Sequence, residues 1–365
     1  MNTNDDTAAL QQAVQQACDT SSAINIQGGG SKSFLGKGGA VSTVSTLNHT
    51  GIVNYEPTEL VVSVRAGTLL SDLTKELAAN GQLLPFEPPQ HDGATIGGVL
   101  ACGLSGPTRP FTGSARDYVL GVRMINGQAQ HLRFGGDVMK NVAGYDVSRL
   151  QIGAYGSLGL LLDASMKVLP VPQYELTLVS TRASTDDYSY IGGLARRALP
   201  VTAAAMQGNI QYIRLSGTEI AVKSAAKQLE GDIDSDANAF WPGLRDQSLE
   251  FFNTSKTLWR ISVAEYAPVL PLSGDWLYDW SGAQRWLCSD EAPEAIFAAA
   301  AAVGGHATRY GTDDTALRFQ PLTGTAQRLQ KRLRDSFDAD RLFNPGQFHP
   351  EFDSDQEQKQ EKTSS

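Results

Sequence analysis

Apolar residues recur at helical or strand-like spacings over the first 80 residues. A helix is expected to begin at Asp6 or Thr7, because its apolar residues share one face: Leu10, Val14 and Ala17. β-branched, alternating residues then predict three strands, at 23–27, 41–44 and 60–67. A helix starting at Thr68 or Ser71 follows and ends at Asn80-Gly81. This order is not a regular βαβ repeat.

Residues 85–113 break this pattern, because they are rich in glycine and proline and carry few helix or strand signals. A segment of this length inside a compact domain usually lines a site. A hairpin is expected at 117–134, with its turn at Asn126-Gly127. Beyond Pro172 strand-like and helical stretches alternate, which suggests an α+β domain. Its strand-like stretches are 211–216, 257–263, 275–280 and 283–289, and its helical stretches are 218–231 and 292–305.

Composition narrows the class of protein. A chain of 365 residues is expected to form two domains. Its net charge of −9 argues against binding to nucleic acid or to anionic lipid. Cys18, Cys102 and Cys288 are too far apart for a metal-binding spacing and suit a reducing compartment. The acidic N-terminal stretch is unlike a signal peptide, and no apolar run approaches ~20 residues, so we expect a cytoplasmic protein.

Residues 24–39, INIQGGGSKSFLGKGG, form a glycine-rich loop with two lysines, which is typical of phosphate binding. A P-loop is disfavoured, because Gly36-Lys37 is followed by Gly38 rather than by Ser or Thr. A Rossmann fingerprint is disfavoured too, because Ser33 replaces its third glycine and no helix follows. The loop alone is equally consistent with a flexible turn between strands.

A second glycine-rich segment, ATIGGVLACGLSG, follows about 65 residues later. Thr95 can cap a short helix there, whose free N–H groups would face an anion. Together the two segments could clamp the two phosphates of a dinucleotide. The alternative is close helix packing at small residues.

The segments QGGGSK, LPFEPP, TIGG, a loop ending in RD, and GSLG occur in an order that resembles the flavin-binding domain of the vanillyl-alcohol oxidase/p-cresol methylhydroxylase type. More narrowly, residues 86–121 and 132–161 resemble the FAD-binding subunit of glycolate oxidase (glycolate dehydrogenase). The resemblance implies an α+β fold, in which a two-subdomain FAD-binding domain precedes a smaller α+β cap domain. The expected divisions are 1–171 for the FAD domain, 172–335 for the cap, 336–350 for a segment returning to the FAD domain, and 351–365 for a disordered polar tail.

The resemblance also implies which residues contact FAD. Around the pyrophosphate it places Gly28, Gly29, Gly30, Ser31 and Lys32, and on the facing wall Thr95, Ile96, Gly97 and Gly98. Toward the adenosine or ribityl chain it places Glu87 and Pro88, and near the isoalloxazine Gly103, Ser105, Gly106 and Gly113. The resemblance places the backbone of Gly159 and Leu160 against the flavin or adenine. It places Asn344 in the C-terminal segment that returns to the FAD domain. The first loop contains no histidine, so non-covalent FAD is expected.

Catalytic residues are weakly marked. Oxidation of a 2-hydroxy acid needs a cation for the carboxylate and a base for the hydroxyl proton. The weak candidates are His306, Arg309 and Arg318, although His306 and Arg309 would point to opposite faces of a strand. The five histidines form no metal-binding pair, so no protein-ligated metal is expected.

Three functions stay open. The first is a FAD-binding subunit that oxidises glycolate to glyoxylate together with a related catalytic flavoprotein subunit and an iron–sulfur subunit, touching a membrane only through these partners. The second is a self-sufficient FAD-dependent dehydrogenase of D-lactate or another 2-hydroxy acid. The third is a structural subunit that has lost FAD.

Overall fold

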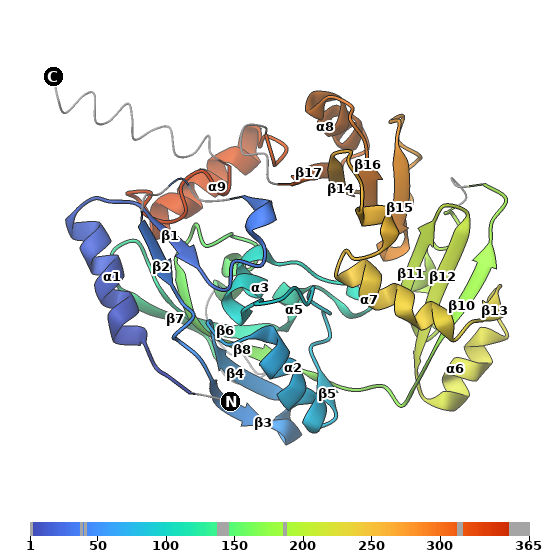
Figure 1. Ribbon diagram of the computed structural model, residues 1–365, viewed down its shortest axis with the longest axis horizontal. Helices are drawn as coiled ribbons and strands as arrows, with labels where there is room; N and C mark the ends of the chain where they lie inside the picture. The colour runs from blue at the N-terminus through green and yellow to red at the C-terminus, as the bar shows by residue number, and fades with distance from the viewer. Residues whose placement is uncertain are drawn as a thin grey trace.

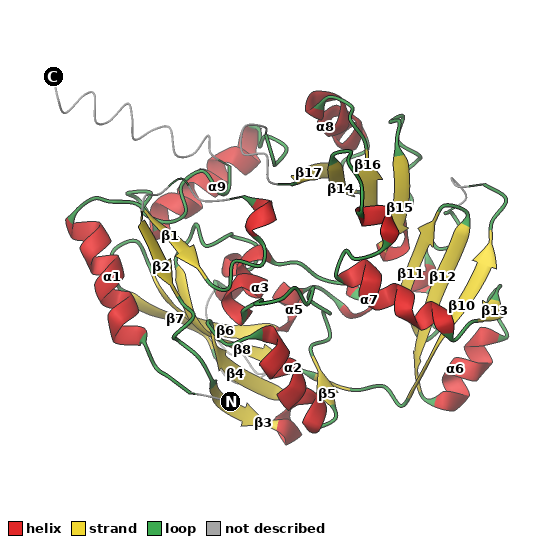
Figure 2. Ribbon diagram, in the orientation of Figure 1, coloured by secondary structure: helices red, strands yellow, loops and turns green. Residues whose placement is uncertain are grey.

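The protein is described here from a computed structural model, which covers residues 3–36, 39, 42–136, 146–184, 188–311 and 317–349. Two sheets lie at opposite ends of an elongated molecule (Figure 1). Helices cover outer faces of these sheets, and long loops cross between them (Figure 2). Lys37, Gly38 and the expected tail 351–365 lie outside the described residues.

The first sheet has five antiparallel strands in the order β3-β4-β8-β6-β7. Its strands are β3 (Ile52–Glu56), β4 (Val61–Arg65), β6 (Val119–Ile125), β7 (His131–Gly135) and β8 (Leu160–Lys167). Helices α2 (Leu70–Ala79) and α3 (Ile96–Cys102) contribute apolar side chains to its core. Short elements complete this region: α4 (Arg109–Thr112), α5 (Ala115–Tyr118), β5 (Gln82–Leu83) and β9 (Leu169–Pro170). The hairpin expected at 117–134 is confirmed as β6–β7.

A smaller subdomain lies beside this sheet. Strands β1 (Ile24–Gln27) and β2 (Ser42–Ser45) pair in parallel, and α1 (Thr7–Asp19) packs alongside through Leu10, Val14 and Ala17, as the apolar spacing predicts. The chain returns here near its end, because Ile24 N–H donates to Leu342 O at 2.7 Å and Asn344 N–H donates to Ile24 O at 2.9 Å. Segments more than 300 residues apart therefore form one unit.

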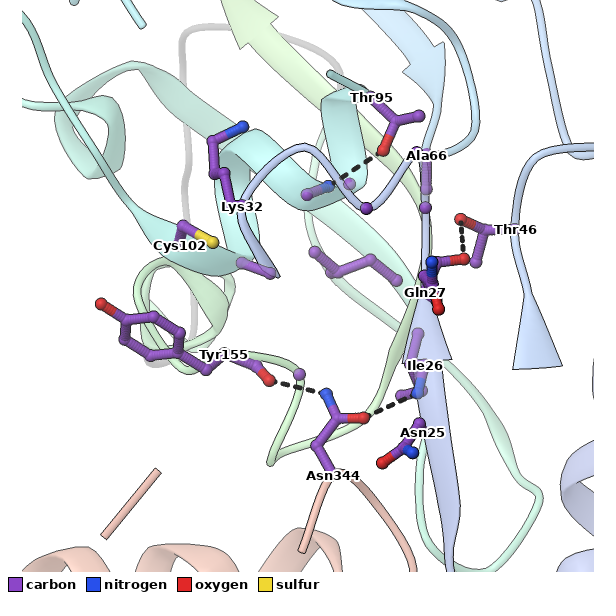
Figure 3. A pocket seen from close by; sticks show the side chains of 18 of the residues that line it. Asn25, Ile26, Gln27, Lys32, Thr46, Ala66, Thr95, Cys102, Tyr155 and Asn344 are labelled. Carbon is purple, nitrogen blue, oxygen red and sulfur yellow. Dashed lines mark hydrogen bonds between the residues drawn. The ribbon is translucent and has the colours of Figure 1, made fainter. Parts of the chain in front are cut away.

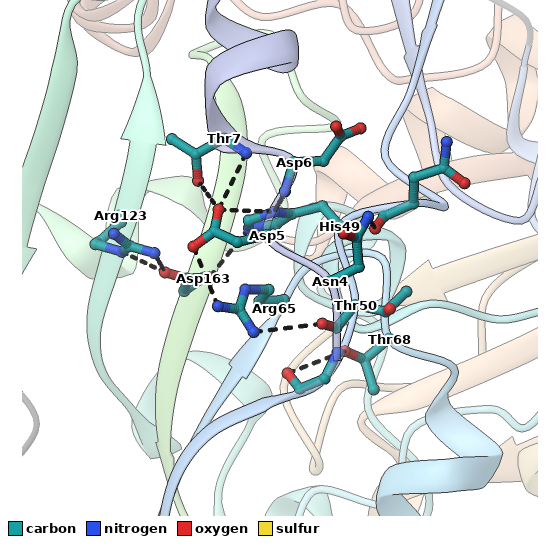
Figure 4. A network of polar contacts seen from close by, with 12 residues as sticks. Asn4, Asp5, Asp6, Thr7, His49, Thr50, Arg65, Thr68, Arg123 and Asp163 are labelled. Carbon is teal, nitrogen blue, oxygen red and sulfur yellow. Dashed lines mark hydrogen bonds and ion pairs between the residues drawn. The ribbon is translucent and has the colours of Figure 1, made fainter. Parts of the chain in front are cut away.

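A buried polar network fastens the N-terminal segment to the five-stranded sheet (Figure 4). His49, fully buried, accepts from the Asp6 N–H through Nδ1 at 3.1 Å, and its Nε2 lies 3.2 Å from Asp163. Arg123 forms an ion pair with the same carboxylate. Hydrogen bonds from Thr7 hold the pKa of the neighbouring Asp5 well below its usual range.

The second sheet has eight antiparallel strands in the order β13-β10-β12-β11-β15-β16-β14-β17. Its strands are β10 (Tyr174–Thr181), β11 (Val201–Gln207), β12 (Ile210–Gly217), β13 (Asp232–Ile233), β14 (Leu258–Ser262), β15 (Asp275–Asp279), β16 (Gln284–Cys288) and β17 (His306–Tyr310). Its helices are α6 (Glu219–Ala226), α7 (Phe240–Arg245) and α8 (Pro293–Ala302). This confirms the four strand-like and two helical stretches expected beyond Pro172.

The last helix, α9 (Gly324–Phe337), lies near α1 and β1 rather than on the second sheet (Figure 1). Its Leu333 and Arg334 line a cavity together with Arg149, Ile152 and Ser157. Helix α9 thus shares this cavity with residues 149–157, and the domain boundary expected at 336 stays a prediction. Among the described residues, no helix is long and apolar enough to span a membrane.

Candidate functional site

A cavity of about 390 Å³ lies between the β1–β2 subdomain and the five-stranded sheet (Figure 3). Segments far apart in the chain line it: 25–33, 95–102, 155–161 and 344–347 contribute most of the wall. Of the residues expected to contact FAD, it brings together Gly28, Gly29, Gly30, Ser31, Lys32, Thr95, Gly97, Gly98, Gly159 and Asn344.

The first glycine loop presents unused backbone donors to this cavity. Within the described ranges, the N–H groups from Gly28 to Lys32 donate to no protein acceptor. Backbone donors that converge without side-chain obstruction are the usual way for a protein to hold a phosphate. The loop therefore suits the pyrophosphate that its sequence suggested.

The same glycines also allow the two glycine-rich segments to touch. A Cβ atom on Gly28 would lie 2.2 Å from Thr95 Oγ1, and one on Gly29 would lie 1.7 Å from the Gly93 carbonyl oxygen. The close-packing alternative therefore holds as well, because glycine is needed here whether or not a ligand is bound.

The second glycine-rich segment differs from expectation. Thr95 does cap α3, since its Oγ1 accepts from Gly98 N–H at 3.3 Å. The N–H groups expected to be free are engaged, however: Ile96 donates to Thr68 O at 2.9 Å and Gly97 to Ala66 O at 2.7 Å. The segment is a wall of the cavity and does not supply free donors from the first turn of its helix.

Lys32 is an unusual cation, because only 8% of it is exposed. Its Nζ has one hydrogen-bond partner in the described part of the chain, Ser31 Oγ at 3.5 Å. Burial lowers the pKa of Lys32, and burial raises the pKa of the nearby Cys102 thiol to about 11. In Figure 3 the ammonium group points away from Tyr155 and Asn344.

Asn344 joins the two walls of the cavity. Its Oδ1 accepts from Ile26 N–H at 2.6 Å, and its Nδ2 donates to the Tyr155 carbonyl oxygen at 2.7 Å (Figure 3). Asn344 and Tyr155 both have positive φ, of 46° and 53°, which is uncommon for residues with side chains. Tyr155 stacks on Phe348 with ring centroids 5.4 Å apart.

The other residues expected to contact FAD lie outside this cavity. Ile96 and Leu160 belong to the apolar cores. Glu87 forms an ion pair with Arg214 of β12 at 2.8 Å, and Pro88 follows it as a buried residue. Gly103 and Gly113 end α3 and α4 with positive φ, while Ser105 and Gly106 border a second, smaller pocket. Glu87 therefore ties the loop to the second sheet instead of facing the cavity.

That second pocket, of about 20 Å³, contains residues that the sequence did not mark. It lies between the glycine- and proline-rich segment 85–113 and the second sheet. Its polar lining includes Arg260, Asp279, Gln284 and Tyr310. Burial raises the pKa of Asp279 to about 7. The available signal was the alternation in LWRIS, where Arg260 stands between the buried Trp259 and Ile261.

The three weak catalytic candidates do not come together in one pocket. His306 and Arg309 point to opposite faces of β17, as expected, because they pair with Ser262 and Trp259 respectively. Arg318 donates to the Phe34 carbonyl oxygen at 2.8 Å, which places it beside the first glycine loop.

Comparison with known proteins identifies the family. Residues 3–135 match the FAD binding domain family. The chain is 45% identical over 344 residues to the glycolate oxidase subunit GlcE of Escherichia coli (strain K12), which covers 94% of this chain and 97% of that protein.

More distant relatives match only part of the chain. It is 30% identical over 155 residues to a D-lactate dehydrogenase of Anaerostipes hadrus, covering 41% of this chain and 32% of that protein. It is also 30% identical over 150 residues to the glycolate oxidase subunit GlcD of Bacillus subtilis (strain 168), covering 41% and 32%.

Among solved structures, an alkyldihydroxyacetonephosphate synthase superposes with a TM-score of 0.67 at 15% identity, covering 92% of this chain and 75% of that one. This likeness shows the fold: the α+β, p-cresol methylhydroxylase-type architecture expected from the sequence is confirmed. The chain belongs to the family of the glycolate oxidase subunit GlcE, as an FAD-dependent oxidoreductase subunit.

Proposed function

We propose that this chain is the FAD-binding subunit of a glycolate oxidase complex, oxidising glycolate to glyoxylate. One observation carries the proposal: a family relationship over nearly the whole chain coincides with a cavity whose first glycine loop offers unused backbone donors. In this reaction the substrate loses a hydride from the carbon that bears the hydroxyl group, and the hydroxyl proton leaves to a base. FAD, when bound, supplies the two-electron acceptor for that hydride.

The residues of the first cavity fit FAD. The N–H groups from Gly28 to Lys32 would hold the pyrophosphate, and the buried ammonium group of Lys32 would gain a counter-charge. Gly97 and Gly98 would form the opposite wall without competing for the phosphates. We propose non-covalent binding, because histidine is absent from the stretch 24–39.

The partners follow from the same proposal. Two electrons leave glycolate and must pass on, and we propose that an iron–sulfur subunit receives them. No cluster site is available in this chain, since its three cysteines are dispersed and free. A related flavoprotein subunit would accompany both, and the chain would work in the cytoplasm, reaching a membrane only through its partners.

A second candidate is a self-sufficient dehydrogenase of D-lactate or a similar 2-hydroxy acid. The partial match to a D-lactate dehydrogenase favours it, although that match spans 32% of the relative. Both candidates require bound FAD, whereas a structural subunit that has lost the cofactor does not.

Two measurements separate these candidates. The purified chain is expected to show flavin absorption near ~450 nm. Denaturation should release the FAD intact, because the proposed binding is non-covalent. A colourless chain that cannot be reconstituted with FAD would contradict both enzymatic candidates. Glycolate is then added with and without the partner subunits, and rapid bleaching by the isolated chain would favour the self-sufficient enzyme.

A further inference from the structure

Two arginines from different domains meet over one aromatic ring. Arg109 begins α4 in the glycine- and proline-rich segment 85–113, and Arg260 lies in the middle of β14. Their guanidinium carbons lie 4.2 Å and 5.2 Å from the ring centroid of Trp280. Trp280 itself is 3% exposed. Because both guanidinium groups lie over this buried ring, they lie where the first part of the chain contacts the second sheet.

Neither cation forms a direct ion pair in the described part of the chain, although the charge of Asp117 acts on Arg109 and Arg260 interacts by charge with Asp279. Arg260 Nε donates to Gln284 Oε1 at 2.6 Å, and the Arg260 side chain also bonds the Tyr310 hydroxyl. Arg109 forms no ion pair and no side-chain hydrogen bond with a described residue. Burial and the charge of Arg260 lower the pKa of Arg109, as expected for partly desolvated like charges. Such a pair is costly unless an anion joins it.

Nearby carboxylates are engaged elsewhere. Asp117 accepts from both the N–H and the Oγ of Ser114, which closes the N-terminus of α5. Asp279 accepts from Trp280 N–H at 2.7 Å and from Gln284 Nε2 at 3.0 Å, so Gln284 separates it from Arg260. This chain of bonds fixes the orientation of Arg260, which interacts with Asp279 by charge and without a direct hydrogen bond.

The sheet register turns further polar groups toward the same place. Arg260 pairs with Trp286 and Thr308, while Ser262 pairs with Gln284 and His306. Paired residues on antiparallel strands share a face. His306 is exposed to solvent on one side, and partial desolvation together with the charges of both arginines lowers its pKa, which favours the neutral imidazole. The face therefore offers two arginines, a histidine and an opening to solvent, together with the carboxyl group of Asp279, whose pKa burial raises to about 7.

We propose that Arg109 and Arg260 form an anion subsite that binds the carboxylate of a small 2-hydroxy acid. Guanidinium groups match a carboxylate with two parallel hydrogen bonds, which a lysine cannot do. The pocket beside Arg260 accommodates one water-sized group, the size of a carboxylate oxygen. The identity of the acid rests on the function proposed above, but the existence of the subsite does not.

The experiment measures anion binding to the full chain by calorimetry, with oxalate, a two-carbon carboxylate that has no C–H bond to lose. We expect oxalate to bind the wild-type chain. Arg260→Gln and Arg109→Gln should each weaken binding about tenfold or more, and Arg260→Lys by less. Arg309→Gln is the matched control, since Arg309 lies on the neighbouring strand but on the opposite face. Near-UV circular dichroism checks that each variant is folded.

The outcomes are decisive in both directions. Unchanged affinity in the folded Arg109 and Arg260 variants, an equal loss in Arg309→Gln, or no oxalate binding by the wild-type chain would overturn the subsite. Tighter binding of inorganic phosphate than of oxalate would overturn its assignment to a carboxylate. FAD content is measured in the same samples. A yellow chain that does not bind oxalate contradicts the subsite alone. A chain that binds oxalate but is colourless and cannot be reconstituted with FAD contradicts the proposed function alone.

Discussion

The indole of Trp280 donates a hydrogen bond of 2.9 Å to the carbonyl oxygen of Gly106, and thereby fastens the second sheet to the glycine-rich loop. Trp280 and its neighbour Ser281 both have positive φ, of 50° and 56°. Two successive side-chain residues in this region of backbone space are strained, and such strain is often found at functional sites. The contact holds the loop against the face that carries Arg260.

Replacing this indole tests the joint between the domains. Trp280→Phe removes the indole donor and leaves the Gly106 carbonyl oxygen with the Arg109 N–H, at 3.2 Å, as its remaining donor, so we expect a loss of about 1 kcal/mol in the free energy of unfolding. Trp276→Phe is the control, because the Trp276 indole has no hydrogen bond within the described residues and is only partly buried. Urea unfolding measures both variants, and equal losses would show that the hydrogen bond does not matter.

The contact between the two glycine-rich segments predicts that substitutions at Gly28 and Thr95 have non-additive effects on stability. Gly28→Ala places a Cβ atom against Thr95 Oγ1, so it should destabilise the chain and weaken FAD binding. Thr95→Ala alone loses the cap of α3 and costs about 1 kcal/mol. The double variant removes the atom in conflict and should be more stable than the sum of the two single changes. A double-mutant cycle measures this coupling, and additive losses would contradict the proposed clash.

Lys32 should trade stability for cofactor binding. Its ammonium group is buried with one long hydrogen bond, so Lys32→Met is expected to raise the unfolding free energy of the FAD-free chain by about 1 kcal/mol or more. The same variant should bind FAD more weakly, because the counter-charge for the pyrophosphate is lost. Unfolding of the cofactor-free chain and FAD titration measure the two effects. A variant that loses stability without FAD would refute the idea.

The network around His49 predicts a purely structural effect. Asp163→Ala strips the buried His49 of a partner and leaves Arg123 without its carboxylate, so about 3 kcal/mol of stability should be lost. The control is Glu219→Ala, whose ion pair with Lys223 is exposed on both sides and should cost less than about 1 kcal/mol. Denaturant unfolding compares the two. FAD affinity of the folded Asp163→Ala chain should be unchanged, and a large loss of affinity would assign Asp163 a role at the site.

Asp279 predicts a pH dependence of stability. Burial raises its pKa to about 7, against about 3.9 for an unfolded aspartate. Between these values the folded chain holds a proton that the unfolded chain has lost, so the contribution of Asp279 to stability falls as pH rises from about 4 to 7. Asp279→Asn removes this fall, so its stability relative to the wild type should increase from about pH 4.5 to about pH 8. Asp275→Asn, exposed on the same strand, is the control, and a flat difference for Asp279→Asn would contradict the shift.

The sequence predicted the elements with clear spacing and missed those set by tertiary contacts. The Ala203–Ala205 run of β11 looks neutral or helical, yet these residues are fully buried in the middle of the eight-stranded sheet, where small side chains fit under α4. Helix α9 was missed although Leu329, Leu333 and Phe337 recur every fourth residue in it; this apolar stripe is narrow, and Arg334 is the residue of the helix that becomes buried.

The site divided in the same way. The glycine loop could be found from composition, because its chemistry lies in consecutive backbone groups. Arg260 could not, because its partners Gln284 and Trp280 reach it only through the pairing of β14, β15 and β16. Single-sequence reading likewise gave Gly97 an open donor, since nothing local reveals that the Ala66 carbonyl oxygen occupies it.

The pairing of Ile24 with the segment at Asn344 has a consequence for biosynthesis. The strand that leads into the glycine loop leaves the ribosome about 320 residues ahead of the residues that flank it. Contacts this distant in sequence form late in folding. The nascent chain would therefore hold an open, incomplete cofactor cleft while the intervening residues are synthesised, and the cleft would close only after the segment at Asn344 has emerged.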